Sequence, residues 1–207
     1  FVRLAKYGRE IAPAATKVSV RAPKATSYGR TVAVRVTTES LKGAAKDAEA
    51  TLYFEPQGVS STRAKVTSIT LDAEGKGVFK VPAQASGSWT VSVEGSWSRA
   101  SGESEPATTT VRYAVQAQAS PTKVAVGTPV TITGSVSPGA AGTAVTVQRR
   151  SATGTWRDVS STTTGSGGSV TVIVKPTVVG AIPYRLRVPA SAGLAQGASP
   201  RITLTVS

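Results

Sequence analysis

Short runs of alternating apolar and polar residues recur along this chain, and turns rich in glycine, proline and serine separate them. Residues 129–136 (PVTITGSV) and 182–188 (IPYRLRV) are typical of the pattern. Successive side chains of a β-strand point to opposite faces, so a period of two predicts strands with one buried face. Strands at this spacing, with turn signals between them, predict an all-β chain built from sandwiches or barrels.

The same order of strands occurs twice. Residues 87–93 (GSWTVSV) match residues 182–188, which aligns Trp89 with Tyr184. The repeat distance is roughly 90 to 95 residues, which is the length of a domain rather than of a solenoid unit. Further matches pair residues 29–37 with 127–135, 50–55 with 144–149, and 74–81 with 167–174.

The repeat predicts three segments: an arm over residues 1–15, a first domain over 16–114 and a second domain over 115–207. Residues 1–7 of the arm favour one extended strand, which an Ala-Pro linker follows. Three alternatives stay open: the last strand of a preceding domain, a donor strand that completes a neighbouring subunit's sheet, or a frayed arm. For a donor strand, the assembly residues are Phe1, Val2, Leu4 and Ile11.

The second half of the chain resembles the bacterial immunoglobulin-like repeats of secreted actinobacterial proteins. The similarity covers nearly all of residues 115–207 and, more loosely, residues 16–114. Its motifs are VGTPVTITGSVSP (126–138), TAVTVQRR (143–150), GTWRDV (154–159), YRLRVPASAG (184–193) and SPRITLTVS (199–207). The resemblance implies two tandem immunoglobulin-like β-sandwich domains that act as a spacer or adhesion module outside the cell or on its surface. We expect the partners to be other domains or subunits of the same assembly.

The composition removes most catalytic chemistry, because the chain contains no histidine and no cysteine. These two residue types serve most nucleophilic and proton-transfer mechanisms, and they also form structural zinc sites. We therefore predict no enzyme activity, no cofactor and no metal site. The paired carboxylates are expected in solvated turns, with a weak Ca²⁺ site at Asp72 and Glu74 as the alternative; the pairs are Asp47 with Glu49, Asp72 with Glu74, and Glu103 with Glu105.

The charge of the chain indicates a partner of opposite sign. Twenty-four lysines and arginines against eleven acids give a formal net charge of +13. Residues 115–207 hold eight of the cations and a single carboxylate, Asp158. Such an excess attracts polyanions over long range. We predict an anionic cell-wall polymer as a partner, we do not expect nucleic acid, and no segment is apolar enough to cross a membrane.

Alternation places four arginines on one exposed face of the second domain. If Tyr184 and Leu186 point to the core, the arginines between and after them point outward. The same argument applies to the neighbouring strands, which share a sheet in the immunoglobulin topology. The predicted basic face consists of Arg150, Arg185, Arg187 and Arg201.

The three tryptophans have different expected roles. Trp89 is in the core register of its strand and is expected to be packed. Trp156 follows a hairpin turn and is expected across the outer sheet face beside Arg157, whereas Trp97 belongs to an exposed serine-rich loop. Because aromatic rings stack on sugar rings, Trp97 and Trp156 are candidate carbohydrate contacts.

The sequence favours a non-catalytic structural or interaction module of an exported bacterial protein, with possible docking on anionic polymers through the basic face. One alternative is a subunit of an extracellular filament or phage particle that assembles through the arm. Another is an accessory carbohydrate-binding module of a larger enzyme.

Overall fold

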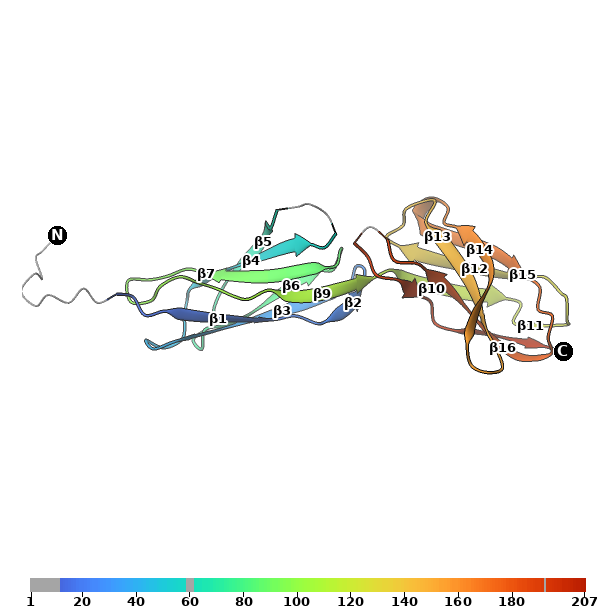
Figure 1. Cartoon of the computed structure of the whole chain (residues 1–207), viewed down its shortest axis with the longest axis horizontal. Coiled ribbons are helices and arrows are strands. Elements are labelled where there is room, and N and C mark those ends of the chain that lie inside the picture. The colour runs from blue at the N-terminus through green and yellow to red at the C-terminus, as the bar shows by residue number, and fades with distance from the viewer. Residues whose placement is uncertain (1–11, 59–61, 192) are drawn as a thin grey trace, which may run out of the picture.

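The chain folds as two β-sandwiches placed end to end (Figure 1). The computed structural model describes residues 12–58, 62–191 and 193–207. Each sandwich consists of one three-stranded sheet and one six-stranded sheet. The all-β prediction of two tandem immunoglobulin-like sandwiches is therefore confirmed. The expected arm and its assembly residues Phe1, Val2, Leu4 and Ile11 lie outside the described residues.

The first sandwich pairs the sheet β1-β3-β6 with the sheet β2-β9-β7-β4-β5, in which β8 also pairs with β7. Its ladders are antiparallel, apart from the parallel pair β2–β9. Its strands are β1 (Thr16–Arg21), β2 (Ala25–Ser27), β3 (Thr31–Ser40), β4 (Glu49–Pro56), β5 (Ala64–Thr70), β6 (Lys76–Pro82), β7 (Gly87–Val93), β8 (Gly102–Glu103) and β9 (Ala107–Arg112).

The second sandwich repeats this arrangement with the sheets β10-β12-β15 and β11-β18-β16-β13-β14, and β17 pairs with β16. Its one parallel ladder, β11–β18, corresponds to β2–β9. Its strands are β10 (Ala114–Ser120), β11 (Lys123–Val124), β12 (Val130–Ser137), β13 (Ala144–Arg150), β14 (Trp156–Thr163), β15 (Ser169–Val174), β16 (Gly180–Val188), β17 (Gly197–Ala198) and β18 (Ile202–Val206), with the short 3₁₀ helix η1 (Ser166–Gly168) before β15.

The core of each sandwich is made by the inward-facing residues of its strands. In β7 every second residue, from Gly87 to Val93, is buried, and the residues between are partly exposed. The corresponding strand β16 buries Ile182, Tyr184, Leu186 and Val188 in the same way. Apolar burial of this kind, at roughly 25 cal/mol per Å², is the main stabilising term of a sandwich.

One part of the predicted repeat alignment is wrong by a residue. Residues 50–55 were aligned with 144–149, which places Ala50 opposite Ala144. In the structure Leu52 pairs with Val91, and Val147 pairs with the equivalent Leu186. Ala50 therefore corresponds to Val145, since both face the core whereas Ala144 is exposed.

The last strand of the first sandwich, β9, ends at Arg112, and the first strand of the second sandwich, β10, begins at Ala114. This change is next to the predicted boundary between residues 114 and 115. Whether residues 16–114 and 115–207 fold as independent domains stays a prediction. Within the described residues, no helix has the length and apolar character that a membrane crossing requires.

Candidate interaction surfaces

The junction between the sandwiches is a set of backbone contacts rather than a free linker. Tyr113 is the single residue between β9 and β10, and it is 7 % exposed. The loop between β16 and β17 folds back onto it. The amide of Tyr113 donates to the carbonyl of Ala195 at 3.2 Å, and the amide of Ala195 donates to the carbonyl of Val111 at 2.8 Å.

Two further contacts strengthen the junction. The amide of Ser86 donates to the carbonyl of Gly193 at 2.9 Å. Gly197 lies so close to Tyr113 that a Cβ atom at this position would collide with the Tyr113 carbonyl oxygen. Leu194 is buried beside these bonds. Because the segment from Gly193 to Gly197 contacts both the first sandwich and Tyr113, these contacts restrain bending between the sandwiches.

The outer face of the larger sheet in the second sandwich contains a connected polar cluster. The guanidinium of Arg185 stacks on the ring of Trp156 at 4.2 Å from its centroid. Its Nε atom also donates to Oε1 of Gln148 at 2.8 Å, and Nε2 of Gln148 donates to Asp158 at 2.7 Å. Gln148 is therefore covered although it points away from the core. Burial, together with the neighbouring charge of Arg187, lowers the pKa of Arg185.

The other predicted arginines lie around this cluster. Arg187 donates from Nη2 to Oε1 of Gln196 at 2.9 Å, and Arg150 donates from Nε to the carbonyl of Gly154 at 2.9 Å. Arg201 is exposed and immediately precedes β18. Trp156 lies across the outer sheet face, as expected, and its ring stacks with Arg185, two strands away.

The cations of the second sandwich have no ionic partners among the described residues. The two ion pairs of the described residues, Lys46 with Asp47 and Arg63 with Glu103, both belong to the first sandwich. Hydrogen bonding to Glu103 raises the pKa of Arg63, which also stacks on Tyr53. In the second sandwich, the side chain of Asp158 accepts a hydrogen bond from Gln148, a neutral group.

The structure separates the two candidate carbohydrate contacts. Trp97 belongs to the loop between β7 and β8 of the first sandwich and is 93 % exposed. Trp156 is on the second sandwich, with one ring face covered by Arg185. Trp89 is 4 % exposed and donates from Nε1 to Oγ1 of Thr109 at 3.0 Å, as expected for a packed side chain.

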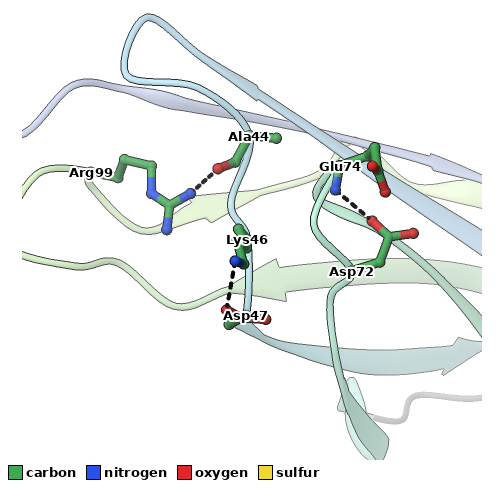
Figure 2. A network of polar contacts seen from close by, with 6 residues as sticks. All are labelled: Ala44, Lys46, Asp47, Asp72, Glu74 and Arg99. Carbon is green, nitrogen blue, oxygen red and sulfur yellow. Dashed lines mark hydrogen bonds and ion pairs between the residues drawn. The ribbon is translucent and has the colours of Figure 1, made fainter.

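The end of the first sandwich that lies away from the junction is called its free end. The carboxylates there lie in turns between strands, where they accept hydrogen bonds or pair with a lysine. Oδ1 of Asp72 accepts a hydrogen bond from the amide of Glu74 at 3.1 Å (Figure 2) and another from the amide of Lys76 at 2.7 Å. Asp47 pairs with Lys46 at 3.8 Å. Within the part of the chain that the structure describes, no group of three or more His, Cys, Asp or Glu side chains is placed to hold a metal ion.

Comparison with solved structures finds 314 similar chains, and the following two resemble this chain only weakly. The D0-D1 domain of intimin has a TM-score of 0.36 and 15 % identity, over 91 % of this chain and 97 % of that one. The superoxide reductase (neelaredoxin) from Ignicoccus hospitalis has a TM-score of 0.37 and 15 % identity, over 45 % of this chain and 80 % of that one. No family model and no curated protein matches the sequence. At these TM-scores, neither similarity assigns a function to this chain.

Proposed function

We propose that this chain is a non-catalytic spacer and interaction module of an exported bacterial protein. The junction is the observation that carries the proposal, because the Tyr113, Ala195 and Gly193 contacts hold two sandwiches in line with one residue between them. A fixed, elongated pair presents whatever is joined to it at a defined distance. The exported setting rests on the resemblance of residues 115–207 to secreted actinobacterial repeats.

Small-angle X-ray scattering tests the spacer role. We expect the chain to have one extended pair-distance distribution. Insertion of Gly-Gly-Ser after Tyr113 is expected to shorten the mean end-to-end distance, since a flexible linker lets the sandwiches fold toward each other. The same insertion after Gly154, in the β13–β14 turn, serves as the control. Equal profiles for the chain and the Tyr113 insertion variant would contradict the proposal.

A second candidate role is docking on an anionic polymer through the basic face of the second sandwich. Eight cations against one carboxylate in residues 115–207 support it, as does the absence of ion pairs in the second sandwich among the described residues. Arg187 and Arg201 lie at the surface with Arg185 between aromatic and amide partners. These groups would contact sulfate or phosphate oxygens while their stems rest on the sheet.

Replacement of Arg185 and Arg187 by serine is expected to weaken heparin binding and to lower its salt slope by about two, since each ionic contact contributes roughly one. Affinity is measured at several salt concentrations. The matched control is Arg35→Ser with Lys80→Ser, which removes the same charge from exposed positions of the first sandwich. If both double variants lose the same affinity, binding follows net charge and the basic face is not the site.

A further inference from the structure

The free end of the first sandwich is built like the end of the second sandwich that makes the junction. The β7–β8 loop and the β16–β17 loop both have eight residues, 94–101 and 189–196. Ser96 and Arg99 exchange backbone hydrogen bonds of 2.7 and 3.3 Å, and Ser191 and Leu194 exchange equivalent bonds of 3.0 and 2.9 Å. The two loops are therefore the same structural element.

In each sandwich, the equivalent loop donates a hydrogen bond to the backbone segment that precedes the first strand. The amide of Ala100 donates to the carbonyl of Ala14 at 2.9 Å, as the amide of Ala195 donates to the carbonyl of Val111 at 2.8 Å. The β16–β17 loop then reaches the end of the neighbouring sandwich through Gly193 and Ser86. No neighbouring sandwich lies against the β7–β8 loop within the described residues.

Instead, large apolar side chains are exposed at this end. Trp97 is 93 % exposed, and Leu41, in the turn after β3, is 98 % exposed. The guanidinium of Arg99 donates to the carbonyl of Ala44, which ties the β7–β8 loop to the segment that follows Leu41 (Figure 2). Exposed aromatic and aliphatic groups held on one rigid end are typical of a protein contact surface.

The opposite end of the molecule has a matching apolar groove. It has a volume of about 360 Å³, and Val178 and Val179 in its wall are 53 % and 67 % exposed. The register of β4 and β7 against β13 and β16 makes Ala152 and Ala181 of the groove equivalent to Gln57 and Ser86. Those are the positions at which the first sandwich meets Gly193. By analogy with the junction, the groove is the surface against which the loop of another sandwich would pack.

The two ends also differ in charge. At the end of the first sandwich away from the junction, exposed carboxylates alternate with cations: Asp47, Glu49, Asp72, Glu74 and Glu94 lie among Lys42, Lys46, Lys76 and Arg99, and Asp47 pairs with Lys46. The groove at the other end is flanked by Arg149 and Arg150. An arginine beside an indole ring adds a cation–π attraction to the ionic one. Contacts between single carboxylates of one end and these arginines of the other would orient two partners head to tail.

We propose that a second copy of this chain docks head to tail, with Trp97 of one copy in the groove that Val178 and Val179 line in the other. Ala14 already occupies the place beside the β7–β8 loop that Val111 takes beside the β16–β17 loop. The copies therefore meet through side chains and not through a shared strand. A contact between two different ends is heterologous, so it adds further copies in a row unless the rotation between copies closes a ring.

Sedimentation velocity over a range of concentrations tests this docking. The net charge of +13 makes the copies repel each other, so we expect the average mass to rise above 21.1 kDa at high concentration and to rise further with salt. Trp97→Ser is expected to weaken association at least about tenfold, as for a central aromatic contact. Val78→Ser is the control, because Val78 is 44 % exposed on β6, where it pairs with Arg35 in the middle of β3 and away from both ends.

A mixture of two end-blocked variants makes the test directional. Trp97→Ser keeps the groove, whereas Val178→Ser with Val179→Ser keeps the tryptophan. We expect each variant alone to stay monomeric and the mixture to form complexes of two chains and no larger ones. A chain that is monomeric at every concentration, or a mixture that does not associate, would overturn the proposal. Either failure leaves the spacer role intact, since that role depends on the junction within one molecule.

Discussion

Replacement of Trp89 by alanine is expected to destabilise the first sandwich by about 3–5 kcal/mol, the usual cost of deleting a large buried aromatic ring. Trp89 is 4 % exposed, and its ring centroid is 4.3 Å from that of Phe54. The substitution also leaves Thr109 without the hydrogen bond from the indole nitrogen. Chemical denaturation followed by circular dichroism measures the loss.

Trp97→Ala is the matched control for this prediction. It removes the same ring from a position that is 93 % exposed, so its effect should stay within about 0.5 kcal/mol. Equal stabilities of the two variants would show that Trp89 is not a core residue. They would then argue against the sheet packing described for the first sandwich.

Gly197→Val is expected to open the junction between the sandwiches. A side chain at position 197 collides with the backbone of Tyr113, and overpacking of this kind costs about 1–3 kcal/mol. The amides of Tyr113 and Ala195, which bond across the junction, should exchange their hydrogens roughly five- to 150-fold faster, because local opening becomes easier by that amount. Hydrogen exchange measured by NMR gives these rates directly.

The neighbouring substitution Ala198→Val serves as the control. Ala198 is in the same short strand, but its side chain is exposed. It should leave both exchange rates unchanged. If Gly197→Val also leaves them unchanged, the close contact at Tyr113 does not hold the sandwiches together.

The strands in which one face is fully buried could be predicted from the sequence alone. Residues 87–93 and 182–188 alternate without interruption, and the alignment of Trp89 with Tyr184 follows from that alternation alone. Alternation does not predict the strand β5, which is an edge strand whose first three residues, Ala64 to Val66, are all exposed. Without a buried face there is no period of two to detect.

The contacts between side chains and between loops could not be predicted. Alternation places Arg185 outside the core, but not on Trp156, since that contact crosses the strand β13 between them. The junction depends on the irregular backbone around Gly193 and Ala195, where periodicity carries no information. The proximity of the Leu41 turn to the Trp97 loop likewise comes from tertiary packing through Arg99 and Ala44.

The distance between the two sandwiches tests the central claim most directly. The chain contains no cysteine, so Arg35→Cys and Thr171→Cys place one spin label on an exposed position of each sandwich. Double electron–electron resonance, recorded on dilute protein to exclude contacts between copies, then measures the distribution of that distance. Two sandwiches held at Tyr113 predict a single narrow distance, and a broad distribution would contradict the fixed pair.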